Sequence, residues 1–429
     1  MPRPSDQWFD YRLESAFQPI LSLSHRRIVG YEALLRGRCS TTGALLPPAR
    51  VFEAANTLEH LHQLEQQSQA VHIANFQRCG DPEAPPKWLF LNVSPETVAD
   101  NAYRDLLPEA LRFGGVRQHQ IVVELLETPG NETTLAEAVD YFRGLGCLVA
   151  LDDFGTGYSN FERLWALEPD LVKLDRSLIQ GAAEALNSKR RILSNLVALI
   201  HEAGSLVVLE GVESEEQAMI ALDADIDLVQ GFYFALPTLD SHAPAERGLA
   251  QVHQVTERFT EETLTAVNRE QITLQPYEQT FLRAATRLDR GHGLRESCAD
   301  LMALRGVQRC FVLNQRGEQV GEHLLPAGLK ADAPVTTDPR HAPLVDTRGG
   351  TWSRRPYFRD ALLAPRRLKI SRPYLSSTGR HVCITLSIAT RSHDDGHYYV
   401  LCCDVAWYPG GAPEKAPCEG TSRAAAPSP

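Results

Sequence analysis

Several signatures that often reveal a function are missing from this sequence. It has nine cysteines but no CxxC pair, and its 14 histidines form no HExxH motif. The odd number and scattered positions of the cysteines are typical of reduced thiols rather than of a disulfide framework. No GxGxxG turn is present either, so nothing indicates a dinucleotide-binding turn. Zinc-site, disulfide and nucleotide-fold interpretations therefore lack support.

Long hydrophobic runs and an excess of basic charge are also lacking. No apolar run reaches the roughly 18 residues of a membrane span. Residues 1–15 contain no apolar stretch of the kind found in signal peptides. The formal net charge is -11, which disfavours nonspecific binding to nucleic acids. We expect a cytoplasmic protein with no membrane span and no nucleic-acid polymer among its partners.

The first 245 residues contain eight short apolar segments, separated by turns and, later on, by helical patterns. A chain of 429 residues is long enough for more than one core. Strands that alternate with helices predict a parallel sheet, and eight of them match an α/β, TIM-like (β/α)8 barrel. An open doubly wound sheet is the structural alternative. The predicted strands are residues 16–23, 28–36, 87–95, 121–127, 147–155, 171–175, 205–213 and 228–237.

The pattern changes after residue 245. Residues 246–290 carry apolar positions at spacings of three and four, which predicts a linker of amphipathic helices interrupted near Pro276. Residues 291–410 become strand-like, with a hairpin turn expected at Gln315–Gly317, and predict a smaller α+β domain. Residues 411–429 are low in complexity, and we expect a disordered tail.

Acidic and other polar residues stand at the ends of the predicted barrel strands. They are Asn92, Glu124, Asp152, Asp153, Lys173 and Glu210. Because the carboxyl ends of barrel strands meet on one face, these side chains are expected around one pocket. Several carboxylates cannot stay ionised at close range without cations, and oxygen ligands favour Mg²⁺ or Mn²⁺. Two adjacent aspartates suit a two-metal site, so we expect a metal-dependent phosphoryl hydrolase with an anionic substrate.

The segment GYEALLR at residues 30–36 resembles the signature of EAL domains. The likeness continues in order through QPI at 18–20, LFLNVSP at 89–95, VVELLE at 122–127, ALDDFGTGYSN at 150–160, LVKLD at 171–175, VLEGVES at 208–214 and LVQGFYFALP at 228–237. The resemblance implies a cyclic di-GMP phosphodiesterase. Such an enzyme hydrolyses this bacterial second messenger to linear pGpG, on a TIM-like barrel with two Mg²⁺ or Mn²⁺ ions.

The resemblance also implies roles for single residues. The implied metal ligands are Glu32, Asn92, Glu124, Asp152 and Asp153. The implied catalytic residues are Glu32, Lys173 and Glu210. The implied substrate-binding residues are Gln18, Leu35, Arg36, Asp175 and Gln230. Glu127 and Glu213 are implied to hold the loop that follows Asp153.

The C-terminal half resembles Cache domains, relatives of PAS sensors. The similar segments are residues 351–362, 370–389 and 400–405. The resemblance implies a PAS/Cache-like sensory domain at 291–410 that regulates the barrel and takes an unidentified small ligand. Arg355, Tyr357, Arg372 and Tyr374 are candidates for its pocket. A packing or dimerisation module without a ligand is the alternative, and the family likeness together with the amphipathic linker predicts a homodimer.

Two functions from different classes remain open. The first is an active, regulated phosphodiesterase, and the second is a non-catalytic receptor for cyclic di-GMP. Leu126 stands where relatives usually have threonine, but no residue that matches a metal ligand is missing. Because a degenerate receptor is expected to have lost such a ligand, the enzyme is favoured.

Overall fold

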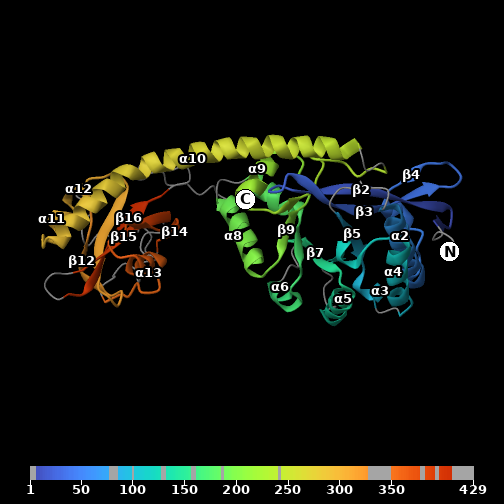
Figure 1. Cartoon of the computed structure of the whole chain (residues 1–429), viewed down its shortest axis with the longest axis horizontal. Coiled ribbons are helices and arrows are strands. Elements are labelled where there is room, and N and C mark those ends of the chain that lie inside the picture. The colour runs from blue at the N-terminus through green and yellow to red at the C-terminus, as the bar shows by residue number, and fades with distance from the viewer. Residues whose placement is uncertain are drawn as a thin grey trace, which may run out of the picture. The chain divides into compact units, whose positions relative to one another are not determined.

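The computed structural model describes residues 6–76, 86–98, 101–126, 132–155, 161–184, 188–239, 243–326, 349–376, 382–391 and 396–407 (Figure 1). The chain divides into two compact units, residues 1–261 and 262–429. The predicted tail at 411–429 lies outside the described residues.

Eight strands of the first unit close into a barrel. The order is β2-β3-β5-β6-β7-β8-β9-β10, and β2 closes the ring by pairing with both β3 and β10. All eight strands overlap the segments that the sequence predicts, although β2 and β3 extend beyond theirs, and the barrel is confirmed. The strands of this unit are β1 (Gln7–Trp8), β2 (Tyr11–Ser22), β3 (Arg27–Cys39), β4 (Leu45–Leu46), β5 (Trp88–Val93), β6 (Ile121–Leu126), β7 (Leu148–Phe154), β8 (Leu171–Leu174), β9 (Leu206–Leu209) and β10 (Leu228–Val229).

One barrel strand runs against the others. β2 is antiparallel to both β3 and β10. All the other neighbouring pairs in the ring, from β3–β5 to β9–β10, are parallel. The expectation of an all-parallel sheet is therefore wrong at this strand. Only residues 23–26 separate β2 from β3. A connection this short makes a hairpin, because a parallel crossover needs about a dozen residues or more.

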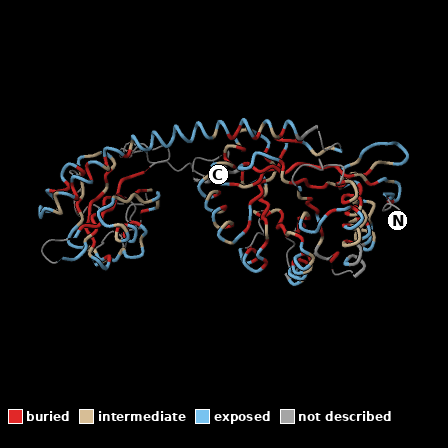
Figure 2. The backbone as a smooth tube through the Cα atoms, in the orientation of Figure 1, coloured by how far each residue is buried: buried red, intermediate tan, exposed pale blue. Residues whose placement is uncertain are grey.

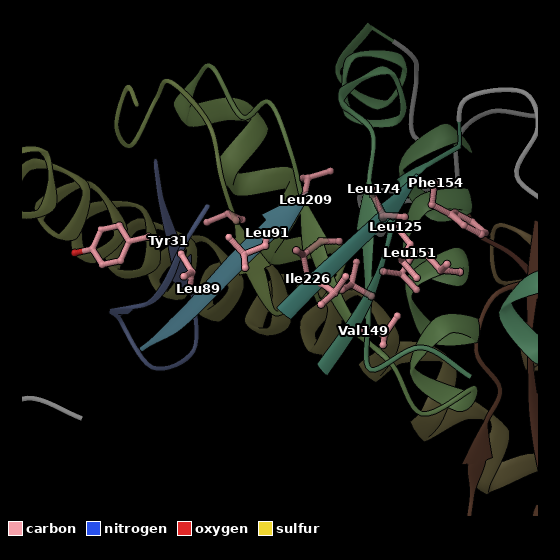
Figure 3. Close-up of a cluster of buried hydrophobic side chains, with 14 of the residues drawn as sticks. Tyr31, Leu89, Leu91, Leu125, Val149, Leu151, Phe154, Leu174, Leu209 and Ile226 are labelled. Atoms are coloured by element: carbon pink, nitrogen blue, oxygen red, sulfur yellow. The ribbon is translucent and has the colours of Figure 1, made fainter. Parts of the chain in front are cut away.

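Helices cover the outside of the barrel. They are α1 (Pro48–Phe52), α2 (Leu58–Phe76), α3 (Pro95–Val98), α4 (Asn101–Phe113), the 3-10 helix η2 (Gln118–Gln120), α5 (Glu132–Leu145), α6 (Phe161–Leu167), α7 (Arg176–Glu184), α8 (Ser188–Glu202) and α9 (Glu215–Asp223). Alternate strand residues such as Leu91, Val149 and Leu209 point outward into one large core (Figure 3). Their neighbours along each strand consequently point into the barrel.

A single long helix, α10 (Ala243–Asp289), follows the barrel and contains Pro276 in its interior. The predicted interruption at Pro276 is therefore wrong. Leu274, Tyr277 and Phe281 on either side of the proline are buried in the core of the second unit. Their burial outweighs the hydrogen bond that proline cannot make. Residues 260–272 of α10 are exposed (Figure 2).

The second unit is an antiparallel sheet with helices, which confirms the α+β expectation. The sheet order is β12-β11-β16-β15-β13, and β14 also pairs with β15. The hairpin turn falls at residues 314–318, where Asn314 Oδ1 accepts hydrogen bonds from the backbone of Arg316 and Glu318. The elements are α11 (Leu294–Ser297), α12 (Ala299–Met302), β11 (Val307–Leu313), β12 (Gln319–Leu324), α13 (Pro356–Leu363), β13 (Lys369–Ile370), β14 (Tyr374–Leu375), β15 (Val382–Arg391) and β16 (Tyr398–Ala406).

Among the helices in the described ranges, none is both long enough and apolar enough to cross a bilayer.

Candidate active site

The barrel interior has an apolar layer and, above it, a polar layer. The apolar layer includes Phe90, Val122, Ala150, Leu171, Val208 and Leu228. Side chains two positions further along each strand point the same way. Those positions are Asn92, Glu124, Asp152, Lys173, Glu210 and Gln230. The period of a β-strand therefore explains why residues from six parts of the sequence meet at the carboxyl end of the barrel.

Glu32 on β3 is buried and belongs to the same polar layer. Its Oε1 accepts a hydrogen bond from Asn92 Nδ2 at 3.2 Å, and its Oε2 accepts one from Gln230 Nε2 at 2.5 Å. Gly30, two positions earlier, stands in the apolar layer. A Cβ there would lie only 2.8 Å from the Phe90 ring, so glycine is needed for this packing. Local packing and two amide donors together hold the Glu32 carboxylate in place.

Lys173 lies at the centre of the carboxylates and is only 1% exposed. Its Nζ is 2.5 Å from Glu124 Oε1, 2.5 Å from Glu210 Oε1, 3.2 Å from Asp152 Oδ1 and 4.0 Å from Glu32 Oε2. One ammonium faces four carboxylates, so the cluster keeps an excess of negative charge.

Asp152, Asp153 and Glu210 form a compact acidic group. One carboxylate oxygen from each lies within 4.8 Å of the others, which is suitable for holding a cation. Asp153 has a backbone φ of 54°, in the left-handed region that few residues other than glycine adopt. Its backbone N–H donates to Asp152 Oδ1 at 3.0 Å. This local conformation brings the second aspartate beside the first, although side chains alternate along a regular strand.

Burial and mutual repulsion shape the proton affinities of the site. Burial raises the pKa of Glu210 to about 7, against the opposing attraction of Lys173. Burial, followed by the charges of Asp152 and Asp175, raises the pKa of Asp153. The pKa of Glu124 is also raised, chiefly by burial. Burial disfavours the Lys173 ammonium, but the surrounding carboxylates outweigh it and raise the lysine pKa. Burial is the largest cause of the raised pKa of the three carboxyl groups, and the neighbouring negative charges add to it.

The predicted substrate residues fall into two groups. Gln18 is buried beside the carboxylates, where its Oε1 accepts a hydrogen bond from Gln230 Nε2 at 3.0 Å. Arg36 is half-buried, and burial lowers the pKa of its guanidinium. The Leu35 side chain is buried in a separate hydrophobic cluster with Trp8. Only the main chain of Leu35 is therefore available for a ligand.

The remaining predicted residues lie at or beyond the rim. Asp175 Oδ1 accepts a hydrogen bond from the backbone N–H of Ser177 at 2.9 Å, at the start of α7. Glu213 is exposed, and its N–H donates to Gln217 Oε1 at 2.6 Å. The loop that Glu213 is implied to hold continues into residues 156–160, which lie outside the described residues. Glu127 lies outside the described residues.

One buried neighbour of the site was not predicted from the sequence. Gln69 on α2 is 3% exposed, and its Nε2 donates to the main-chain oxygen of Asn92 at 3.2 Å. Its Oε1 is buried without a hydrogen-bond partner among the described residues. Gln69 belongs to a helix rich in glutamine and glutamate, so sequence pattern alone does not distinguish it from its exposed neighbours.

Comparison with protein families and curated proteins connects the barrel to known proteins. The EAL domain family matches residues 10–237. The cyclic di-GMP phosphodiesterase RocR of Pseudomonas aeruginosa is 28% identical over 231 residues, which are 53% of this chain and 58% of RocR. The cyclic di-GMP phosphodiesterase NbdA of the same organism is 30% identical over 243 residues, which are 53% of this chain and 29% of NbdA. The chain thus spans only part of each relative.

A solved structure with a similar fold matches this chain beyond the barrel. The YkuI protein of Bacillus subtilis has an EAL domain and was crystallised with its substrate cyclic di-GMP and calcium. YkuI is 20% identical to this chain. The match covers 92% of this chain and 96% of the YkuI chain, with a TM-score of 0.70. At this identity the likeness supports the architecture of barrel, long helix and antiparallel sheet domain.

Proposed function

The chain belongs to the EAL domain family, and on that premise we propose that it is a metal-dependent phosphodiesterase that hydrolyses cyclic di-GMP to linear pGpG. The observation that carries the proposal is the buried Lys173 ringed by four carboxylates at the barrel mouth. RocR and NbdA, two cyclic di-GMP phosphodiesterases to which this chain is similar, support the choice of substrate.

The donor atoms of the site fit divalent cations. Glu124 is fully buried, and its Oε2 has no hydrogen-bond partner among the described residues. Gln230 Oε1 is also buried without a partner in that part of the chain. All candidate ligands offer oxygen, the donor that Mg²⁺ and Mn²⁺ prefer. We assign Glu32, Asn92, Glu124, Asp152 and Asp153 as the residues that would hold two such ions.

Each polar side chain then has a separate task. When bound, the ions would lower the pKa of a coordinated water and stabilise negative charge on the phosphate. Lys173 holds the carboxylates together and places its ammonium beside the reacting phosphate. Glu210, with a pKa of about 7, can exchange a proton near neutral pH and is the proposed general base. Arg36 offers a planar set of donors to a second phosphate.

The proposed reaction is a single hydrolysis. A water oxygen forms a bond to phosphorus while the bond from phosphorus to the ribose 3′-oxygen breaks. Glu210 takes the proton of the water, and the leaving 3′-oxygen takes a proton from solvent water to give a free hydroxyl. Pairing of Gln18 with Gln230 and of Gln230 with Glu32 keeps this part of the pocket rigid during the step.

The test is a hydrolysis assay on the full-length protein with Mg²⁺ or Mn²⁺, with pGpG quantified by chromatography. We expect Glu32→Ala and Asp152→Asn each to lower kcat by about three orders of magnitude, because each removes a proposed metal ligand. Asp140→Asn is the matched control, since Asp140 is exposed on α5, and it should leave kcat unchanged. Saturable binding of cyclic di-GMP without any pGpG from the unmodified protein would establish the receptor alternative instead.

A further inference from the structure

A cavity lies at the amino-terminal end of the barrel. Its volume is about 510 Å³, which falls within the roughly 300–1,000 Å³ of pockets that hold small molecules. The first residues of β3, β5, β9 and β10 all line it, namely Arg27, Trp88, Leu206 and Leu228. The cavity is therefore formed where the parallel strands begin.

This cavity is separate from the proposed active site. Trp88 lies four residues before Asn92 on β5, and Leu206 lies four residues before Glu210. Four residues of strand span about 13 Å. The apolar layer that includes Leu228 fills the barrel between the two ends. A ligand in the cavity would consequently not touch the carboxylates that surround Lys173.

The floor of the cavity is apolar and contains an aromatic ring. Leu228 belongs to the apolar layer of the barrel, and Trp88 and Val29 pack against that layer. The Trp88 ring meets the Phe90 ring edge to face, with centroids 6.4 Å apart, and Trp88 is only half-buried. Leu249 at the start of α10 adds another apolar side chain. This floor suits the flat face of an aromatic ligand.

The lining also carries basic side chains that lack acidic partners. Arg27 is exposed, and its guanidinium forms no hydrogen bond or ion pair with any described residue. Lys87 Nζ lies 5.3 Å from the centroid of the Tyr31 ring and has no ion pair within the same ranges. Both positive charges therefore remain available to an anion.

The acidic side chain in the lining is already engaged. Asp227 Oδ2 accepts hydrogen bonds from His201 Nε2 and from the Val207 backbone N–H, each at 2.8 Å. Two basic side chains and one carboxylate leave the described lining with a formal charge of +1 when histidine is neutral. A monoanion matches this charge.

Charge and shape together select the class of ligand. A guanidinium can donate two parallel hydrogen bonds to a carboxylate, and aromatic rings pack favourably on one another. We propose that Arg27, Trp88 and Leu206 form a binding site for a small aromatic monocarboxylate. The ring of the ligand lies against Trp88 and Leu206, and its carboxylate lies beside Arg27.

The test is calorimetric titration of the full-length protein with compounds that share one ring and differ in charge. Indole-3-acetate is the anion, indole-3-acetamide the neutral analogue and tryptamine the cation, while acetate supplies the carboxylate without the ring. We expect saturable binding of indole-3-acetate, about tenfold weaker binding of the amide, and none of tryptamine or acetate. The measurement involves no turnover, so its outcome is independent of the proposed phosphodiesterase activity.

Two variants locate the binding. Arg27→Gln removes the charge that faces the carboxylate, and Leu206→Glu places a like charge on the apolar wall. Both positions are exposed, and each change should weaken binding of indole-3-acetate about tenfold. The matched controls are Arg26→Gln and Ile192→Glu, at exposed positions outside the lining, and both should keep the affinity. Circular dichroism verifies that each variant is folded.

Three results would each overturn the proposal. The first is no binding of indole-3-acetate up to about 10 mM. The second is binding of the amide, tryptamine or acetate as tight as that of indole-3-acetate. The third is an unchanged affinity for indole-3-acetate in either Arg27→Gln or Leu206→Glu.

Discussion

At the scale of single residues, Lys173 neutralises only part of the negative charge of the acidic site. Keeping the remaining carboxylates ionised is unfavourable without further positive charge. Glu124 exposes 0% of its surface, and its carboxylate is held only by the contact with Lys173 within the described structure. Isolated buried carboxylates normally take up a proton instead of staying charged. Divalent ions bound as proposed would keep these groups ionised.

The stability of the metal-free protein should fall as pH rises through neutrality. The pKa of Glu210 is about 7 in the folded chain, above the ordinary value of 4.5. The folded state therefore binds this proton more tightly than the unfolded state. Its contribution to stability is complete below pH 4.5 and is lost as pH rises through about 7. Urea unfolding midpoints between pH 4.5 and 8 measure this trend.

Glu210→Gln is the variant that separates this group from the rest of the cluster. This variant should reduce the loss of stability with rising pH without abolishing it, because the pKa values of Asp153 and Glu124 are raised as well. Saturating Mn²⁺ should reverse the trend, since the ion competes with protons for the same oxygens. An identical pH profile in the variant would contradict the assignment.

Gln69 should influence metal binding through Asn92, which it contacts. Gln69 Nε2 holds the main-chain oxygen of Asn92, whose side chain donates to Glu32. Mutation of a residue that supports a metal ligand in this way typically lowers metal affinity by about 10–100-fold. We expect Gln69→Leu to weaken Mn²⁺ binding about tenfold in calorimetric titration. Gln63→Leu, at an exposed position of the same helix, should leave the affinity unchanged, and equal affinities in all three proteins would refute the role of Gln69.

At the scale of elements, the alternation of side chains along each strand is enough to explain which of them face the barrel interior. The long helix, in contrast, depends on tertiary contacts. α10 continues through Pro276 even though the residue cannot donate a backbone hydrogen bond. Pro276 itself is exposed, so no side-chain packing requires it. The proline is thus a local weakness that buried neighbours in the helix overcome.

Replacing Pro276 with alanine should stabilise the second unit. The change restores a helical N–H donor and improves helix propensity, and we expect a gain of about 1–3 kcal/mol in the free energy of unfolding. Urea denaturation followed by circular dichroism measures the change. Gln275→Ala, at the adjacent exposed position, should alter stability by no more than about 0.5 kcal/mol. A less stable Pro276→Ala protein would show that the proline is required for the native helix.

At the scale of the whole molecule, the boundary of the barrel unit lies inside α10. The sequence places the end of the barrel domain at residue 245, but the compact unit extends to residue 261. Val252 and Val255 are both fully buried in the barrel core. The start of the helix, residues 243–261, therefore packs as part of the barrel unit.

A fragment that ends at residue 261 should be more stable than one that ends at residue 245. Fully burying a valine contributes about 1.5–3 kcal/mol, so the shorter fragment loses several kcal/mol. Thermal unfolding of the two fragments measures the difference. Within the longer fragment, Val252→Ala should lower the melting temperature, whereas Gln254→Ala at an exposed position should not. Equal melting temperatures for both fragments would contradict this boundary.

Much of the site follows from the sequence because strand geometry is local. Apolar segments with a polar residue at the end identify Asn92, Glu124, Asp152, Lys173 and Glu210, and the structure brings all five to the barrel mouth. The short stretch between β2 and β3 also contained the signal for an antiparallel pair. Connection length is a property of the chain alone, so this feature was predictable as well.

Other features depended on contacts between residues far apart in the chain. The unbroken α10, the burial of Gln69 against Asn92 and the exposure of Glu213 result from packing that no local pattern encodes. The buried ion pair between Arg309 and Asp404 likewise joins residues that are 95 positions apart in the chain. The sequence by itself determined the order of the side chains along each strand and the charge that each side chain carries. Only the tertiary structure decided which polar groups are buried without partners, because burial depends on the surroundings of a residue in space.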